Sequence, residues 1–368
     1  MSHRIAFFGS SLVSAWWNGA ATYYRGIVRA LHERGHHVTF FEPDAWDRQA
    51  HRDIPDPDWA EVVVYEGLEG LRRCLRRARE HDVVVKASGV GVFDELLERE
   101  VLELQATSRQ VLFWDVDAPA TLARLRERPT DPFRALVPRY DAVLTYGGGP
   151  PVVAAYEAVG ARRCVPVYNA HDADTHHPVP PDPRFECTLA FLGNRLPDRE
   201  ERVRRFFFEV AEALPHEIFL LGGNGWGDVR LPPNVRWLGH VYTRDHNALN
   251  CTPRAVLNIS RDSMADMGWS PATRVFEAAA AGACIVTDAW EGIDHFFAPD
   301  HEILVAASGD EVAAHLRALD EDRARRIGDA ARRRALSDHT YARRVLLVEA
   351  VLDERSLAQR ATPAPEAS

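Results

Sequence analysis

The stretch LNISRDSMADMGWSPATRVFEAAAAGACIVTD, residues 257–288, contains a short apolar run, a polar loop, an apolar helical segment and a second apolar run. This order predicts a strand that ends near Asn258 and Ile259, a helix that continues to Gly282, and the strand CIVTD. Two strands with a helix between them are the repeating unit of a parallel α/β sheet. The stretch therefore predicts an α/β fold for this part of the chain.

The same alternation extends to both sides of this stretch. Apolar runs with helical segments between them include RIAFFGS, VTFFEP, DVVVKASG, QVLFWDVD, DAVLTYG and CVPVYNA in the first half and TLAFLGN, EIFLLGG, VRWLG and ILVA in the second. The segment HDADTHHPVPPDPRFE, rich in Pro and Asp, interrupts the pattern. We predict a first domain at 1–172, a linker at 173–186, a second domain at 187–352 and a disordered tail at 353–368. The last helix is expected to pack back on the first domain.

Composition narrows the possible functions. The formal net charge of −10 disfavours nucleic acid as a partner, because that binding depends on clustered Lys and Arg. Lys86 is the only lysine, and it lacks the context of a Walker phosphate loop or a pyridoxal Schiff base. We expect it to be a strand-end charge that reaches solvent. The five scattered cysteines contain no C-x-x-C pair and suggest small buried side chains rather than disulfides or zinc ligands.

The sequence shows no membrane or secretion signal. No apolar run approaches the roughly 18 to 20 residues that span a bilayer, and the start MSHRIAFFGSS lacks the pattern of a signal peptide. We therefore expect a cytoplasmic protein without an integral membrane segment. The oligomeric state stays open.

The helix within 257–288 begins with residues suited to binding an anion. Ser270 is a suitable N-cap and Pro271 suits the first helical turn, while Arg274 adds a cation with bidentate reach. The exposed N–H groups at a helix start favour a diphosphate. Glu277 lies on the same face as Arg274, where its carboxylate could accept hydrogen bonds from ribose hydroxyls. The alternative is a surface salt bridge between Arg274 and Glu277.

The string SPATRVFEAAAAGACIVTD, preceded by LNIS and followed by EGIDHFF, resembles the donor-binding block of GT-B glycosyltransferases, in particular the CgeB-like group. FLGNR at 191–195, WLGHVY at 237–242 and HTYARR at 339–344 also match. The resemblance implies two Rossmann-like, doubly wound parallel-sheet domains that face a central cleft. It also implies a nucleotide diphosphate sugar, UDP- or dTDP-linked, on the second domain, with no separate cofactor. The donor-binding residues predicted from the motifs and the resemblance together are Gly193, Asn194, Arg195, Gly223, His240, Val241, Tyr242, Asn258, Arg261, Ser270, Thr273, Arg274 and Glu277.

The catalytic base is predicted in the first domain. Retaining GT-B enzymes often carry a glutamate eight positions before the ribose glutamate, and here that position is Trp269, so an inverting mechanism is favoured. An inverting transferase needs a base for the acceptor hydroxyl, and Asp115 and Asp117 in VLFWDVDAP end a predicted strand. We favour Asp117, with a helix cap or turn as its alternative role. Neither this D-x-D pattern nor the histidines of HDADTHH is expected to bind a metal.

The loop after the first strand is the predicted acceptor site. Its candidate residues are Ser10, Ser11, Trp16, Trp17 and Gly19, of which the aromatic side chains could stack on a sugar or an aglycone. The acceptor could be a small molecule, a glycan or a protein. Two other functions fit the same fold, namely a sugar-nucleotide epimerase or hydrolase and a sugar-nucleotide-binding protein without catalysis.

Overall fold

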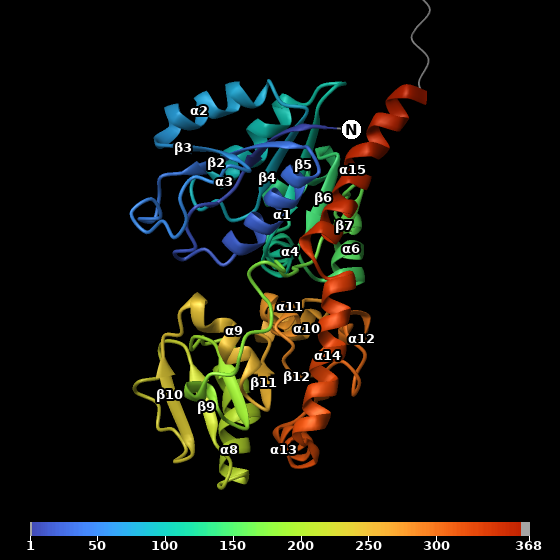
Figure 1. Cartoon of the computed structure of the whole chain (residues 1–368). Coiled ribbons are helices and arrows are strands. Elements are labelled where there is room, and N and C mark those ends of the chain that lie inside the picture. The colour runs from blue at the N-terminus through green and yellow to red at the C-terminus, as the bar shows by residue number, and fades with distance from the viewer. Residues whose placement is uncertain (1, 362–368) are drawn as a thin grey trace, which may run out of the picture. The chain divides into compact units, whose positions relative to one another are not determined.

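A computed structural model describes residues 2–361, with the surroundings of side chains described as far as Asp353. The chain divides into two compact units, each built on one sheet (Figure 1). Unit 1 comprises Met1–Tyr168 and Tyr341–Ser368, and unit 2 comprises Asn169–Thr340.

Unit 1 contains a seven-stranded sheet in the order β3-β2-β1-β4-β5-β6-β7, and all of its strand pairs are parallel. The strands are β1 Arg4–Phe8, β2 His37–Pro43, β3 Glu61–Tyr65, β4 Val83–Ala87, β5 Gln110–Asp115, β6 Ala142–Thr145 and β7 Cys164–Pro166. The α-helices are α1 Ala21–Glu33, α2 Gly67–Ala78, α3 Asp94–Glu100, α4 Ala118–Glu127, α5 Pro132–Leu136, α6 Gly149–Ala158 and α15 Tyr341–Ala361, with 3₁₀ turns η1 Val101–Leu104 and η2 Val137–Arg139. The sequence pattern missed only β3 among these strands.

Unit 2 contains a six-stranded sheet in the order β10-β9-β8-β11-β12-β13, again with parallel pairs. The strands are β8 Leu189–Leu192, β9 Phe219–Gly222, β10 Val235–Gly239, β11 Ala255–Asn258, β12 Ile285–Asp288 and β13 Leu304–Ala306. The helices are α7 Glu200–Val203, α8 Glu209–Ala213, α9 Thr243–Cys251, α10 Asp262–Met267, α11 Thr273–Ala280, α12 Ile293–Phe296, α13 Gly309–Ala318 and α14 Glu321–Asp338, with the 3₁₀ turn η3 Pro183–Phe185 and the π-helical segment η4 Arg204–Phe208. The predicted doubly wound parallel architecture is confirmed in both units.

The central strands are largely apolar because the sheets are buried between layers of other residues. In unit 2, Phe206 and Phe207 on η4 are buried with Phe191, Phe219 and Leu257, which come from three strands. Strands buried on both faces are expected to be continuously apolar, as these strands are. Figure 1 shows helices along the sheet in each unit.

Lys86 corrects one expectation. The side chain is fully buried rather than solvent-exposed, and its ammonium group lies 2.7 Å from an Asp94 carboxylate oxygen and 3.9 Å from one of Glu98. It also lies over the ring of Phe113, 5.6 Å from the centroid. An ammonium removed from water requires such partners. The single lysine is therefore part of the unit 1 interior.

The C-terminal segment also differs from the sequence pattern. From Asp310 to about Leu352 the sequence pattern is helical and amphipathic, and the structure divides this stretch into three helices, α13, α14 and α15. Residues 353–361, predicted to be disordered, continue α15, and residues 362–368 lie outside the described residues. The α15 helix packs on α1, where a Cβ added at Gly26 would lie 2.2 Å from the ring of Tyr341. Only glycine at position 26 permits this close approach.

Candidate functional site

Three segments at the carboxyl ends of β8, β9 and β10 are joined by hydrogen bonds to backbone carbonyl groups. The Gly223 N–H donates to the Gly239 carbonyl over 2.7 Å, and the Trp226 Nε1–H donates to the Gly193 carbonyl over 2.9 Å. Gly223 has a φ of +115°, and a Cβ there would lie 2.3 Å from the Gly193 oxygen. Glycine is required at 223 both for this backbone conformation and for this contact. The predicted donor residues Gly193, Asn194 and Gly223 are thus brought together.

Three arginines of unit 2 influence one another beside these loops. Arg199 donates to the Asn194 carbonyl over 2.6 Å, and its pKa is lowered by burial and by the charges of Arg274 and Arg261. Arg261 is paired with Asp198, while Arg274 has no hydrogen bond or ion pair to the rest of the described residues. Neighbouring positive charges repel one another, which is why Arg274 and Arg261 lower the pKa of Arg199. An anion bound here would relieve that repulsion, and the two phosphates of a nucleotide diphosphate have the matching charge.

Glu277 lies in the same electrostatic neighbourhood. One of its carboxylate oxygens is 3.6 Å from His176 Nε2. The pKa of His246 is lowered mainly by burial and then by Arg274, and Glu277 acts in the opposite direction. The His246 Nε2 lies 3.2 Å from the Val241 carbonyl. Within the described residues Arg274 and Glu277 form no salt bridge, so their side chains are not occupied with each other.

Asn258 has a supporting position rather than an open one. Its Nδ2 donates to Thr287 Oγ1 over 3.0 Å in the sheet interior. Next to it, the buried Asp288 carboxylate accepts from the Ser260 N–H over 3.1 Å and from Arg202. Burial raises the pKa of Asp288, while the charge and hydrogen bonds of Arg202 oppose this effect. These bonds fix the start of the loop that carries Arg261.

The predicted N-cap at Ser270 is wrong. The helix α11 begins at Thr273, its N-cap is Ala272, and no side chain caps it. Ser270 is buried, and the following proline disfavours helical backbone at position 270. The N–H groups left without partners at the helix start therefore belong to residues near Thr273 and Arg274.

Arg195 is occupied by carboxylates. Its guanidinium donates to both oxygens of Glu200 at 2.7–2.8 Å and to Asp228 at 3.0 Å. Arg199, four residues further along, instead contacts the Gly193–Asn194 turn through the Asn194 carbonyl. Sequence reasoning missed Arg199, His176 and His246. The only signals were a second arginine after FLGNR and a histidine inside the predicted linker.

Two aromatic rings follow β10. His240 and Tyr242 are exposed, with ring centroids 4.6 Å apart in an edge-to-face arrangement. The Arg244 guanidinium lies over the Tyr242 ring, 5.2 Å from its centroid. Tyr242 is 59% exposed. This ring is accessible to a flat ligand such as a nucleobase.

The two predicted catalytic carboxylates of unit 1 have different surroundings. Asp115 is fully buried and accepts from Ser88 Oγ over 2.7 Å, from Thr121 Oγ1 over 3.1 Å and from the Tyr156 hydroxyl. A carboxylate with these partners holds loops together, so its surroundings favour a structural role for Asp115 over a catalytic one. Asp117 is exposed and occupies the N-cap position of α4 without capping it through its side chain.

The predicted acceptor loop is partly buried. Ser10 and Ser11 are buried and hydrogen-bonded to Asn18 and Glu42 respectively, so their hydroxyls stabilise the loop. Trp16 and Trp17 are 43% and 84% exposed, and Gly19 faces open space. The tryptophans are the members of this set that remain accessible to an acceptor.

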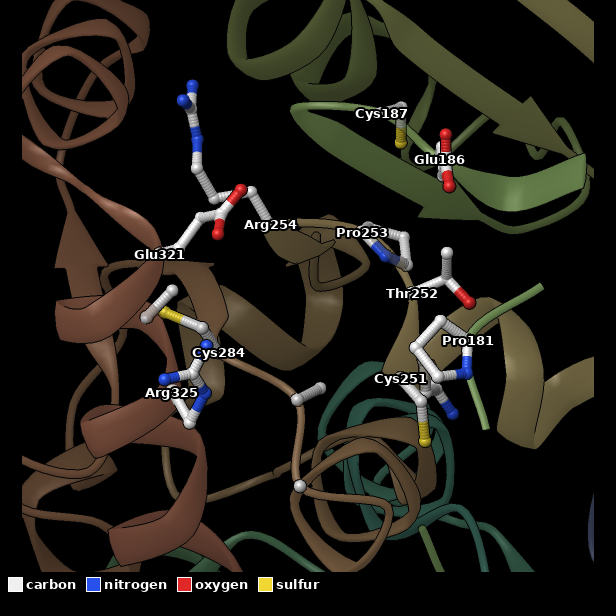
Figure 2. A pocket seen from close by; sticks show the side chains of 14 residues that line it. Pro181, Glu186, Cys187, Cys251, Thr252, Pro253, Arg254, Cys284, Glu321 and Arg325 are labelled. Atoms are coloured by element: carbon white, nitrogen blue, oxygen red, sulfur yellow. The ribbon is translucent and has the colours of Figure 1, made fainter. Parts of the chain in front are cut away.

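A cavity of about 540 Å³ lies at the amino ends of the unit 2 strands, opposite to the loops described above (Figure 2). Cys187, Arg254 and Cys284 line it and lie just before the amino ends of β8, β11 and β12. Figure 2 shows Glu321 and Arg325 of α14 beside Arg254 and Cys284. Ligands of open parallel sheets bind outside the carboxyl ends of the strands. The cavity is therefore separate from the predicted donor residues.

Two further features of the described residues concern metal binding and membrane insertion. No group of three or more His, Cys, Asp or Glu side chains in that part of the chain is arranged to hold a metal ion. In the same part, no helix is both long and apolar enough to cross a membrane.

Comparison with known proteins relates this part of the chain to a described family. Residues 199–350 match a family model described as glycosyl transferase-like. The chain carries a glycosyltransferase-like domain. The matched residues include α11 with Arg274 and Glu277, and they begin at Arg199. No curated protein matches the sequence.

Solved structures show the same fold over nearly the whole chain. Sucrose-phosphate synthase from Thermosynechococcus elongatus is 15% identical with a TM-score of 0.65, covering 96% of this chain and 99% of that one. The Anabaena protein HepE in complex with UDP and glucose is 14% identical with a TM-score of 0.67, covering 95% and 99%. A glycosyltransferase from Rickettsia africae is 10% identical with a TM-score of 0.66, covering 96% and 99%. The chain has the GT-B fold, and this fold together with the glycosyl transferase-like domain supports a glycosyltransferase enzyme.

Proposed function

We propose that the protein transfers a sugar from a UDP-sugar, or a dTDP-sugar, to a hydroxyl group of an acceptor. The observation that carries the proposal is the group of mutually repelling arginines, Arg199, Arg261 and Arg274, beside the glycine-containing loops at the carboxyl edge of the unit 2 sheet. HepE, which shares the fold, was solved with UDP and glucose. The similarity of SPATRVFEAAAAG to the CgeB-like group supports membership in that group as part of the proposal.

Each part of the donor has a candidate partner in unit 2. The diphosphate is assigned to Arg199, Arg274 and the N–H groups at the start of α11, because helix starts and guanidinium groups bind phosphate oxygens. The ribose is assigned to Glu277, whose carboxylate can accept from two hydroxyls. The base is assigned to the backbone near Val241 and to the exposed ring of Tyr242.

We propose that the reaction needs no resident metal or cofactor, since the arginines supply the positive charge that a metal would supply in other transferases. Asp117 is proposed as the base that accepts the acceptor proton, which fits an inverting displacement at the anomeric carbon. Trp269 occupies the position of the second glutamate of many retaining enzymes. Its backbone is in the left-handed region, and its N–H donates to the Glu291 carbonyl over 2.6 Å.

The decisive experiment measures stabilisation by UDP in thermal unfolding. A ligand at a hundred times its dissociation constant adds about 2.7 kcal/mol to the free energy of unfolding. We expect UDP to stabilise the wild type equally with and without EDTA. Arg274→Gln or Glu277→Gln should weaken UDP binding about 10- to 100-fold, since a hydrogen bond to a charged group contributes about 1.5–3 kcal/mol.

Arg325→Gln is the matched control. Arg325 is paired with Asp322 and lines the cavity at the amino ends of the unit 2 strands, away from the predicted donor residues. Its UDP affinity should equal that of the wild type. If UDP and dTDP fail to stabilise the wild type, the donor assignment is wrong. Release of UDP from UDP-sugars at the same rate with and without acceptors would instead indicate a hydrolase on the same fold.

A further inference from the structure

Three exposed tryptophans follow two neighbouring strands of unit 1. Trp16 and Trp17 lie in the loop after β1, and Trp46 lies in the turn after β2, which pairs with β1 in parallel register. Trp46 is 62% exposed. Large aromatic side chains usually bury most of their surface, and those left exposed at a strand's carboxyl end mark binding surfaces.

The rings form a corner. The His51 ring stacks on Trp16 with centroids 4.0 Å apart and an interplanar angle of 8°. The Trp17 ring stands at 83° to Trp16 with centroids 6.3 Å apart. The His51 Nδ1 lies 2.9 Å from the Asp47 carbonyl oxygen and therefore donates to it, which leaves Nε2 as the acceptor in the neutral ring. We call Trp16, Trp17 and His51 the tryptophan corner.

The loop that carries the corner is held by buried polar groups. The fully buried Glu42 carboxylate accepts from Ser11 Oγ, from the Leu12 N–H and from Gln49 Nε2, at 3.0, 2.6 and 2.6 Å. The buried Asn18 amide donates to the Ser11 carbonyl at 2.9 Å and to a second carbonyl of the loop at 3.0 Å. Because these bonds tie the β1 loop to β2 and its turn, the corner is prepared before any ligand binds.

The backbone beneath the rings is strained. Trp17, Trp46 and Asp47 have φ values of 46°, 60° and 56°, a region that side chains other than glycine seldom adopt. Such residues persist where their surroundings determine the conformation, and they concentrate at ligand sites. Trp17 and Trp46, two of these residues, are also among the most exposed large hydrophobic side chains of unit 1.

The nearby charges select the kind of ligand. Arg25 is paired with Asp53 at 2.7 Å, and Arg52 is paired with Asp56. Arg48 is buried and donates to the Ser10 carbonyl over 3.1 Å. These arginines are occupied, so they offer little attraction to the anionic headgroups of a membrane or to nucleic acid. An aromatic surface with neutral or acidic neighbours fits an uncharged, hydroxyl-rich ligand.

We infer that the tryptophan corner binds a neutral pyranose unit, so that the acceptor of the proposed transferase is a saccharide or carries a sugar. The C–H face of a pyranose is slightly positive and stacks on the negative face of an indole. Its hydroxyls can donate to the His51 Nε2 and to the Asp47 carboxylate. Two rings at 83° cannot both lie flat on a planar polycyclic aglycone, whereas a puckered sugar has faces and edges for both. The inference rests on the proposed function only where it calls the bound sugar an acceptor. Sugar binding at the corner does not depend on it.

The test measures direct sugar binding by saturation-transfer NMR on the full chain, using neutral mono- and disaccharides and no nucleotide. We expect at least one sugar to bind the wild type and to bind Trp17→Ala or Trp16→Ala about tenfold more weakly, as expected for one lost stacking contact. Both tryptophans are exposed, so these variants should fold. Ile218→Ala, which removes an exposed apolar side chain of unit 2, is the control and should leave sugar binding unchanged.

Each outcome separates this inference from the donor proposal. Stabilisation by UDP should be the same in Trp17→Ala and in the wild type. Sugar binding without any UDP binding would overturn the donor assignment and leave the corner supported. The inference is overturned if none of the sugars binds, or if the tryptophan variants bind them as the wild type does. It is also overturned if the wild type co-sediments with phosphatidylglycerol vesicles and Trp17→Ala does not, because the corner would then bind a membrane surface.

Discussion

At the scale of single residues, two carboxylates only two positions apart have unlike surroundings. Asp115 is the last residue of β5, and its carboxylate accepts from hydroxyl groups of α4, of α6 and of the loop after β4. Asp117 lies beyond the strand end and is exposed. Burial with full hydrogen bonding suits a structural carboxylate, whereas a general base must reach the substrate.

Exchange of each carboxylate for an amide should separate these roles. Asp117→Asn should lower turnover about 100-fold or more, while the free energy of unfolding and UDP binding stay close to those of the wild type. Asp115→Asn should lower the free energy of unfolding by about 2 kcal/mol or more, because it disturbs a buried hydrogen-bond network. Urea unfolding and steady-state kinetics of both variants check this. Unchanged turnover in Asp117→Asn would rule out this base.

The cavity cysteines should be unreactive although a cavity reaches them. Burial raises the pKa of both Cys187 and Cys284 to about 12. At pH 8 the thiolate, which is the reactive form, is then on the order of one molecule in ten thousand. We expect iodoacetamide at pH 8 to leave both thiols unmodified in the folded protein and to alkylate all five cysteines in denaturant, as mass spectrometry can count. Rapid alkylation of Cys284 before unfolding would contradict the burial argument.

The sequence could predict only part of the candidate site. Arg274 and Glu277 were identifiable because they share a helix face next to a strand end, which is local information. Arg199 and His176 were missed because their roles depend on contacts across the fold, with the Asn194 carbonyl and with Glu277. The N-cap was predicted at Ser270 for the same reason. Serine is locally preferred at an N-cap, but the sequence does not show that Ser270 is buried.

At the scale of elements, the unit 2 loops depend on backbone contact at glycine. Gly223→Ala adds a Cβ that would lie 2.3 Å from the Gly193 oxygen at a φ of +115°, so the two loops must separate. Backbone strain alone costs about 1–3 kcal/mol. We expect a loss of stability of at least that size together with weaker UDP binding, measured by urea unfolding and calorimetry.

Gly239→Ala is the comparison for that prediction. Gly239 also has a positive φ, +70°, but an added Cβ would meet nothing within 4 Å. We expect only the left-handed backbone cost, about 1–2 kcal/mol, and near-normal UDP binding. Equal UDP affinity in the two variants would show that the contact between the Gly193 and Gly223 loops is irrelevant to the donor.

Most strands could be predicted from the sequence because they are short apolar runs between turn signals. The missed strand β3, Glu61–Tyr65, is an edge strand that is only partly buried, so its apolar signal is short and follows an irregular segment. The helical stretch that follows β8 is continuous from α7 to α8 but contains the π-helical segment η4. Its three consecutive phenylalanines, Phe206, Phe207 and Phe208, are buried in the core of unit 2, and the period of an ordinary α-helix does not reveal a π-helical segment.

At the scale of the whole molecule, buried histidines should make stability depend on pH. Burial lowers the pKa of His81 and His171 below the ordinary value of 6.5. The unfolded chain therefore binds more protons just below pH 6.5, so stability is fully present above that pH and is lost as the pH falls. Burial is the largest cause of the lowered pKa of His171, and the charge of His176 lowers that pKa further.

Urea unfolding between pH 5 and 8 should show this dependence. We expect His171→Leu to reduce the loss of stability between pH 6.5 and 5 by about 1 kcal/mol, since one displaced proton contributes up to 1.36 kcal/mol per pH unit. His32→Leu, at an exposed position on α1, should leave the dependence unchanged. Identical pH profiles for the wild type and His171→Leu would contradict the assignment.

The buried position of Lys86 has a practical consequence for following the folded state. Since the chain has no other lysine, a folded molecule presents no lysine amine to an acylating reagent, and an unfolded molecule presents one. Acylation of this single side chain would therefore count unfolding events, one per chain, without an introduced label. The rate of that reaction in native buffer would report how often the interior of unit 1 opens.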